Sequence, residues 1–309
     1  MKQVITLTLN PCLDKTIEIG SLVPGGLNRV LSHRTDVGGK GINVSKVLSN
    51  FGVKTVACGL LPETGSAGFL AALERQGISH DFFLLPGALR TNYKLREQQG
   101  GQVTEINESG PEVSVAHVTL FLESMEKKLA NASVLVLSGS VPPGVPKDFY
   151  GRLCAMGAKL GIPTIVDADG EQLREAIRQK PYAIKPNLFE LEQLCGHSLE
   201  SEQAILSAAR ELIAGGVSLV VVSMGAEGAL FVTKEETARA IPPKVSCLST
   251  VGAGDSMVAA VACALEQNLN LQMLARLATA AGTVTATCPG TEVCDLAAVR
   301  DMEKRIVLR

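Results

Sequence analysis

The residues best suited to chemistry stand late in the chain, where small residues precede an acid in Gly252-Ala253-Gly254-Asp255. An alanine-rich helical stretch, Val258–Leu265, follows them. Backbone amides of small residues at a helix N-terminus can bind an anion. Phosphoryl transfer needs such donors for the phosphoryl oxygens, and a base for the attacking hydroxyl. The amides of residues 252–254 could be the donors and Asp255 the base, while a helix N-cap is the competing interpretation of Asp255.

A second glycine cluster lies early, in Gly38-Gly39-Lys40-Gly41, with Asn43 shortly after it. An amphipathic segment follows, so loop amides at a helix N-terminus again offer a site for an anion. Lys40 adds a positive charge to that site. The cluster is not a Walker A loop, because Gly41 follows the lysine where that motif has Ser or Thr.

The composition of the chain and the absence of certain motifs argue against several classes of protein. The chain of 309 residues is 46% hydrophobic and 19% charged, which is typical of a globular protein. Its formal net charge of −2 argues against a nucleic-acid partner. Met257 stands where a dinucleotide fingerprint has its third glycine, which argues against an NAD-dependent enzyme. No apolar run is long enough to cross a bilayer, so no membrane partner is expected.

The eight cysteines are expected to be buried, reduced thiols. No two of them have Cys-x-x-Cys spacing, and no histidine lies at convincing metal-ligand spacing from them. The sequence also shows no signal peptide at its start. Together these features predict a cytoplasmic protein.

Short β-branched strands alternate with helical segments through most of the chain. The strands are apolar on both faces and end at polar residues, among them Ser138, Asp167, Lys185 and Ser223. This alternation predicts one α/β domain over residues 1–309, a doubly wound and mostly parallel sheet flanked by helices. Such sheets bind ligands at the carboxyl ends of their strands, where the polar residues fall.

Two segments, approximately 12–37 and 90–109, depart from this pattern and predict a small second sheet. Thr91–Arg96 alternates in polarity, Gln99-Gly100-Gly101 follows as a turn, and Val103–Ile106 completes a solvent-facing hairpin. The sheet is either peripheral decoration or a lid over the site. Because an exposed hairpin must be covered or paired, we expect a homodimer through this sheet.

The two glycine clusters, in this order, resemble those of the ribokinase-like superfamily of carbohydrate kinases. The resemblance runs from the first strand to beyond residue 290 and includes Thr8–Asp14, Ser138–Gly144, Lys185–Glu190 and Ser223–Gly228. It implies a ribokinase-like fold with a small β-sheet lid, and a kinase that uses ATP and Mg²⁺ on a sugar-phosphate substrate.

The segments 90–92 and 104–107 are most similar to kinases of ketohexose phosphates. The resemblance therefore favours fructose 1-phosphate as the acceptor, with fructose 1,6-bisphosphate as the product. Tagatose 6-phosphate and fructose 6-phosphate remain alternatives. A non-catalytic nucleotide or sugar-phosphate sensor on the same scaffold is a further alternative, although a sensor has no need of the acid at position 255.

The resemblance also implies roles for individual residues. The sugar-phosphate site would include Asp14, Arg29, Gly38, Gly39, Lys40, Asn43, Arg90 and Ser138. Of these, Arg29, Lys40 and Arg90 could hold the acceptor phosphate by charge-assisted hydrogen bonds, although Arg29 is nearly as well explained as a solvated charge. ATP would bind at Lys185, Asn187, Ser223, Gly225, Gly228 and Gly254. Mg²⁺ would be organised through water by Asn187 and Glu190.

A loop for a monovalent cation such as K⁺ is a last implication of the resemblance. Its members would be Ser249, Val251, Thr285, Cys288 and Gly290, most of them through backbone carbonyls. Many family members have Asp at the position of Ser249, so the geometry of this loop stays open.

Overall fold

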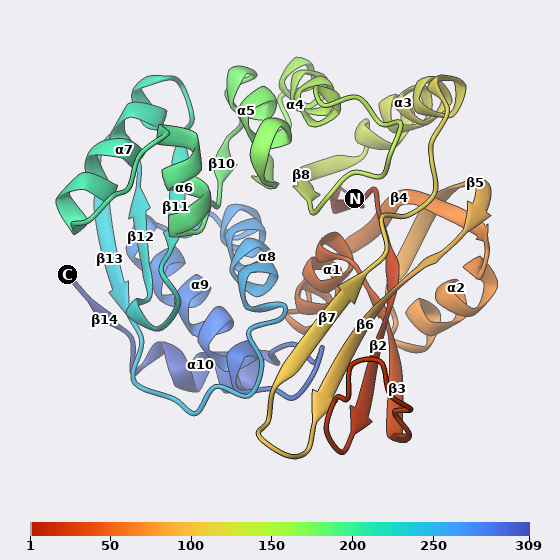
Figure 1. Cartoon of the computed structure of the whole chain (residues 1–309). Helices are drawn as coiled ribbons and strands as arrows, with labels where there is room; N and C mark the ends of the chain where they lie inside the picture. Colours follow the sequence, from red (N-terminus) through yellow and green to blue (C-terminus); the bar gives the residue numbers. More distant parts are fainter. Residues whose placement is uncertain (1) are drawn as a thin grey trace.

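A twisted, mostly parallel sheet forms the centre of the molecule (Figure 1). The computed structural model describes residues 2–309, and within them the strand order is β14-β13-β12-β11-β10-β9-β8-β1-β4-β5. The parallel part comprises β1 (Gln3–Thr8), β4 (Thr55–Thr64), β5 (Ser79–Ala88), β8 (Ala132–Ser138), β9 (Thr164–Asp167), β10 (Ala183–Ile184) and β11 (Leu219–Ser223). An antiparallel edge adds β12 (Ala229–Val232), β13 (Thr237–Ile241) and β14 (Val307–Leu308). The predicted α/β fold class is confirmed.

Alternating side chains of the buried strands build an apolar core on each face of this sheet. In β8, Val134 and Val136 pack on one face and Leu135 and Leu137 on the other. The first face is covered by α1 (Lys40–Asn50), α8 (Ala253–Glu266), α9 (Leu271–Ala286) and α10 (Leu296–Glu303), with α2 (Ser66–Arg75) on β4. The second face is covered by α3 (Val115–Leu129), α4 (Phe149–Lys159), α5 (Gly170–Arg178), α6 (Leu188–Cys195) and α7 (Glu202–Ala214). Because both faces are covered, the strands are continuous apolar runs.

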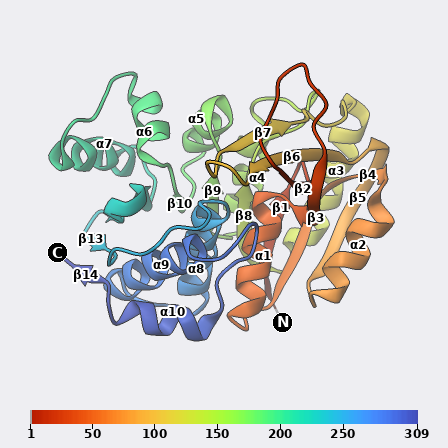
Figure 2. The same cartoon turned by 60° about the horizontal axis from the view of Figure 1, so that its bottom comes forward.

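A second sheet of four strands projects from one side of the main sheet (Figure 2). Its order is β3-β2-β6-β7, with β2 (Cys12–Ile19), β3 (Val30–Gly38), β6 (Arg90–Glu97) and β7 (Val103–Asn107). The predicted solvent-facing hairpin is present, since β6 and β7 pair antiparallel with Tyr93 opposite Ile106. The strands fall almost wholly in the two segments that departed from the strand–helix pattern.

All eight cysteines are free thiols, as expected. Five of them are buried, at Cys12, Cys58, Cys154, Cys263 and Cys294. The expectation of burial is wrong for Cys247, which is exposed because it lies in an irregular segment between β13 and α8. Within residues 2–309, no helix is both long enough and apolar enough to span a membrane.

Candidate active site

A cavity of about 1110 Å³ opens at the carboxyl ends of the central strands. The ends of β1, β8, β9 and β11 border it, together with the first turns of α1 and α8 and residues of β2, β6 and β7. Ligands of open α/β sheets bind at this edge. The cavity is at the large end of the range for small-molecule sites, so it can hold two substrates side by side.

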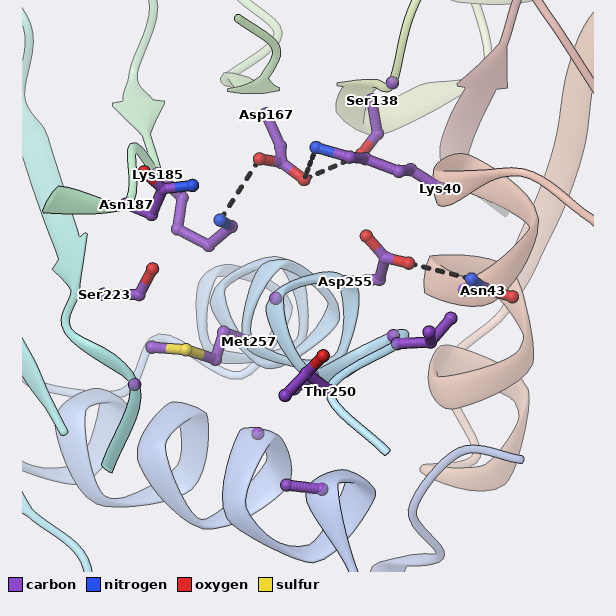
Figure 3. Close-up of a pocket in the computed structure, with 18 of the residues that line it drawn as sticks. Lys40, Asn43, Ser138, Asp167, Lys185, Asn187, Ser223, Thr250, Asp255 and Met257 are labelled. Atoms are coloured by element: carbon purple, nitrogen blue, oxygen red, sulfur yellow. Dashed lines mark hydrogen bonds and ion pairs between the residues drawn. The ribbon is translucent and has the colours of Figure 1, made fainter. Parts of the chain in front are cut away.

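Asp255 lies at the centre of this cavity, in the first turn of α8 (Figure 3). The N-cap of α8 is Gly252, with a left-handed φ of 79°, so Asp255 does not occupy the capping position. Its Oδ2 accepts a hydrogen bond of 2.8 Å from Asn43 Nδ2. Burial, and next the nearby carboxylate of Asp167, raises the pKa of Asp255 to about 6. A carboxylate with this pKa is ionised at neutral pH and is a stronger base than an ordinary aspartate.

Two lysines meet at Asp167, whose side chain is 1% exposed at the end of β9 (Figure 3). Lys185 Nζ lies 3.1 Å from Oδ1, and Lys40 Nζ lies 3.4 Å from Oδ2. Ser138 Oγ donates a hydrogen bond of 3.3 Å to Oδ2. Burial alone would raise the pKa of Asp167, but Lys185 and Lys40 outweigh it and hold that pKa below its ordinary value. Asp167 in turn raises the pKa of Lys40, so this ammonium group stays charged.

The strands of the second sheet bring polar side chains to the other end of the cavity. Strand register places Asp14 of β2 beside Asn92 of β6, and Asn92 opposite Asn107 of β7. Asn92 Nδ2 donates a hydrogen bond of 3.3 Å to Asp14 Oδ1. Gly38 leaves room for this carboxylate, because a Cβ there would lie 2.2 Å from Asp14 Oδ2. This row can bind the hydroxyls of a sugar.

Arg90 lies at the entry to β6 and also lines the cavity. Its Nε and Nη2 donate to the carbonyl of Asn10 at 3.2 and 2.9 Å. Its Nη1 donates to Asn92 Oδ1 at 3.2 Å and to the carbonyl of Glu108 at 2.9 Å. One of the five N–H groups of a guanidinium therefore stays free for a ligand. Through these bonds Arg90 links Asn10, which follows β1, to Asn92 in β6 and to Glu108 directly after β7.

The opposite end of the cavity is built from the segments expected to bind a nucleotide. Ser223, Gly225 and Gly228 line it at the end of β11. Gly228 has a φ of 86°, and a Cβ there would lie 2.1 Å from the carbonyl oxygen of Ala240. The close approach of β12 to β13 thus requires glycine at this position. The wall formed by Pro242–Val245 and by Thr283 and Ala286 of α9 was not expected, because these residues, Lys244 included, belong to no chemical motif.

Asn187 and Glu190 form a capping box at the start of α6. Asn187 Oδ1 accepts from the amide of Glu190 at 2.8 Å, and Glu190 Oε2 accepts from the amide of Asn187 at 2.8 Å. Both residues line the cavity, and Glu190 Oε1 is outside the capping box. Among the described residues 2–309, no group of three or more His, Cys, Asp or Glu could hold a metal ion. One free carboxylate oxygen suits Mg²⁺ that is bound mainly by substrate phosphates and water.

The remaining predicted residues lie at or beyond the border of the cavity. Val251 lines it, and Ser249 Oγ donates a hydrogen bond of 2.8 Å to the carbonyl of Gly290. Thr285 Oγ1, in the last turn of α9, lies 2.7 Å from Ser256 Oγ in the first turn of α8. The amide of Ser249 donates to the carbonyl of Ala286 at 3.3 Å, so the two segments expected to bind a cation lie against each other. Arg29 is exposed and does not line the cavity of this chain.

Comparisons with known proteins agree with this geometry. Residues 7–298 match the family model for pfkB family carbohydrate kinases. A 1-phosphofructokinase of Xanthomonas campestris is 43% identical over 90% of this chain and 89% of its own length. A 1-phosphofructokinase of Borreliella burgdorferi is 37% identical over 92% of this chain and 91% of its own.

Solved structures show the same fold over the whole chain. Phosphofructokinase-2 of Escherichia coli in complex with potassium superposes with a TM-score of 0.92 at 29% identity, covering 98% of this chain and 99% of that one. The structure of the same enzyme with fructose-6-phosphate gives a TM-score of 0.89 at 27% identity, with the same coverage. The chain belongs to the pfkB family of carbohydrate kinases.

Proposed function

We propose that the protein transfers the γ-phosphoryl group of ATP to fructose 1-phosphate, giving fructose 1,6-bisphosphate and ADP. The observation that carries the proposal is a single cavity with Asp255 beside the amides of residues 252–254 and with Arg90 at its sugar end. The carboxylate suits a hydroxyl acceptor, and the guanidinium suits an acceptor that already carries a phosphate. The 1-phosphofructokinase relatives at 43% and 37% identity favour fructose 1-phosphate among such acceptors.

The proposed reaction assigns each group one task. The C6 hydroxyl attacks the γ-phosphorus, the bond to the β-phosphate oxygen breaks, and the hydroxyl proton passes to Asp255. The amides of residues 252–254, with the ammonium groups of Lys40 and Lys185, stabilise the charge on the transferred group. Asn187 and Glu190 would hold Mg²⁺ through water, and the ion would supply positive charge to the phosphates of ATP. The row of Asp14 and Asn92 orients the sugar.

Initial rates with ATP and Mg²⁺ on three sugars in parallel test the proposal. Fructose 1-phosphate should give a higher kcat/KM than tagatose 6-phosphate or fructose 6-phosphate. A preference for either of the other two would keep the kinase and change the acceptor. No turnover with any of the three, together with tight nucleotide binding, would favour the sensor alternative.

The charge of Glu190 is expected to set the Mg²⁺ requirement. Glu190→Gln keeps the capping box, because Gln serves at this position as well as Glu. Only the charge is lost, so the Mg²⁺ concentration for half-maximal rate should rise several-fold. Glu192→Gln is the control, since Glu192 lies on the same helix outside the cavity and accepts from the amide of Leu199 at 2.8 Å. An unchanged Mg²⁺ dependence in Glu190→Gln would leave Asn187 and Glu190 with a capping role alone.

We also infer a K⁺ site at the junction of the 249–252 and 285–290 segments. The contacts between Ser249 and Gly290 and between Thr285 and Ser256 support it, since they hold the two segments against the start of α8. The potassium complex of Escherichia coli phosphofructokinase-2 is consistent with such a site. A cytoplasmic location fits both the use of ATP and the eight free thiols.

We propose that the second sheet closes over the sugar and pairs with a second subunit. Val30 and Leu31 of β3 and Ile106 of β7 are 55%, 56% and 53% exposed, so both edge strands of this sheet present apolar side chains to solvent. Sedimentation velocity at working concentration should therefore give a dimer, and Ile106→Lys should shift it toward monomer. A wild-type protein that is monomeric and fully active would contradict the dimer.

A further inference from the structure

We propose that Asp167 is a positioning residue that holds the ammonium groups of Lys40 and Lys185 at the phosphoryl-transfer site and supplies the negative charge facing Asp255. This inference rests on the proposed function, because it assigns the two lysines to the transferred group. In the sequence, Asp167 is only the residue at which a short apolar strand ends.

The contacts of Asp167 come from three separate parts of the chain (Figure 3). Lys40 opens α1, Ser138 ends β8, and Lys185 follows β10. Oδ2 receives Lys40 and the hydroxyl of Ser138, while Oδ1 faces Lys185 through the ion pair alone. A carboxylate buried to 1% exposure is stable as an anion only with such partners. Asp167 is therefore the shared counter-charge of two cations that are distant in sequence.

Lys185 borders the small residues that precede Asp255, and Lys40 crosses the cavity beside Gly139 to reach Asp167. A Cβ built on Gly254 would lie 3.3 Å from Lys185 Nζ, so this ammonium borders the amides of residues 252–254. The stem of Lys40 lies along Gly139, where a Cβ would be 3.4 Å from Lys40 Cβ. Lys185 is only 6% exposed, and an ammonium group so buried needs a nearby anion. Without Asp167 the two cations would repel each other and lose their anchor.

Asp167 also affects Asp255, because it is the one anion among the charged groups of residues 2–309 that act on that carboxyl. Lys40 and Asn43 face it from α1, Lys185 from the segment after β10, and Asp167 from β9. The residues of α9 that line the cavity, at positions 279, 282, 283 and 286, are uncharged, as is Ser138 of β8. Burial and Asp167 raise the pKa of Asp255, whereas Lys40, Asn43 and Lys185 lower it. Removing the charge at position 167 leaves the lysines unopposed, so the pKa of Asp255 should fall.

The variant Asp167→Asn tests both parts of the proposal. The acid limb of the pH profile of kcat/KM should move to lower pH by about one unit, the low end of the effect of a close charge. The rate plateau should fall at least about tenfold, as expected when preorganised charges at a transition state lose their positions. Asp169→Asn is the matched control, because Asp169 lines the same cavity two residues later but is exposed. It should leave the acid limb unmoved.

A titration in the absence of substrates separates this inference from the proposed function. The ¹³C NMR titration of the Asp255 carboxyl, assigned with Asp255→Asn, should inflect near pH 6 in wild type and lower in Asp167→Asn. If wild type phosphorylated none of the three sugars, the proposed function would fail while this titration still reported on Asp167.

Three outcomes would overturn the inference. One is an unmoved titration of Asp255 in Asp167→Asn. Another is a raised Mg²⁺ requirement with an unmoved acid limb, which would make Asp167 a metal-site residue. If Asp167→Asn does not fold, Lys40→Met should instead raise the inflection of Asp255, since it removes a cation that lowers it. An inflection that stayed or fell in Lys40→Met would overturn the charge balance proposed here.

Discussion

Replacement of Asp255 by Asn is expected to lower kcat by about 10²–10⁴, the usual contribution of a general base. Asn has the same size, and its Oδ1 can still accept the hydrogen bond that Asn43 Nδ2 donates at 2.8 Å. The change therefore removes basicity and leaves the packing of α8 in place. Steady-state rates at saturating ATP and fructose 1-phosphate measure the loss, and circular dichroism checks the fold.

The matched control is Asp295→Asn. Asp295 is an aspartate at the start of α10 that caps its helix, accepting from the amide of Ala298 at 2.9 Å. Asn caps about as well as Asp, so this variant should keep full activity. Near-normal turnover in Asp255→Asn would leave Asp255 as a structural residue and would contradict the proposed mechanism.

Stability should change in the opposite direction to activity in Asp255→Asn. The folded-state pKa of about 6 lies above the usual value near 3.9, so the folded protein binds this proton more tightly than the unfolded chain does. The stabilisation from that proton is present at low pH and is lost as pH rises through about 6. Asn carries no titrating proton, so the variant does not lose stability in this way as pH rises. The Tm of the variant relative to that of wild type should therefore be higher at pH 8 than at pH 5. Keeping the carboxylate of the general base buried and ionised at neutral pH thus costs stability.

The local parts of the site could be predicted from sequence, because their chemistry depends on neighbouring residues. Small residues before Asp255 are enough to indicate an anion nest at a helix start, and α8 begins there. The Asn187-x-x-Glu190 pattern was assigned to Mg²⁺, yet the same spacing is the signature of a capping box, which the structure contains. The sequence therefore also predicted a capping box, which our assignment of this pattern to Mg²⁺ alone did not include.

Asp167 could not be assigned from sequence for a physical reason. Its importance comes from Lys40 and Lys185, which the sheet order brings to one strand end from different crossover connections. Sequence periodicity identifies the strand but not which side chains meet beyond it. The wall at Pro242–Val245 was missed for another reason, since its two prolines, lysine and valine match no motif and look like any other loop.

Replacement of Arg90 by Ala is expected to lower kcat/KM for fructose 1-phosphate by roughly ten- to hundredfold. Loss of a hydrogen bond to a charged group costs about 1.5–3 kcal/mol, and about 1.4 kcal/mol is tenfold. The KM for ATP should barely change, because Arg90 lines the end of the cavity formed by the second sheet. A second contribution to the loss of kcat/KM comes from the structure itself. Arg90→Ala also removes the hydrogen bonds that Arg90 donates to the carbonyls of Asn10 and Glu108.

Two further variants separate phosphate recognition from this bracing of the hairpin. Arg90→Lys keeps the charge but loses the planar fork, so it should recover only part of the loss if paired hydrogen bonds hold the phosphate. Arg96→Ala is the control, because Arg96 lies further along β6 and does not line the cavity. Equal losses for both substrates in Arg90→Ala would indicate general damage to the site. If Arg90→Ala had no effect while Lys94→Ala lowered kcat/KM for fructose 1-phosphate alone, the acceptor phosphate would lie at Lys94, the next cation of β6 that lines the cavity.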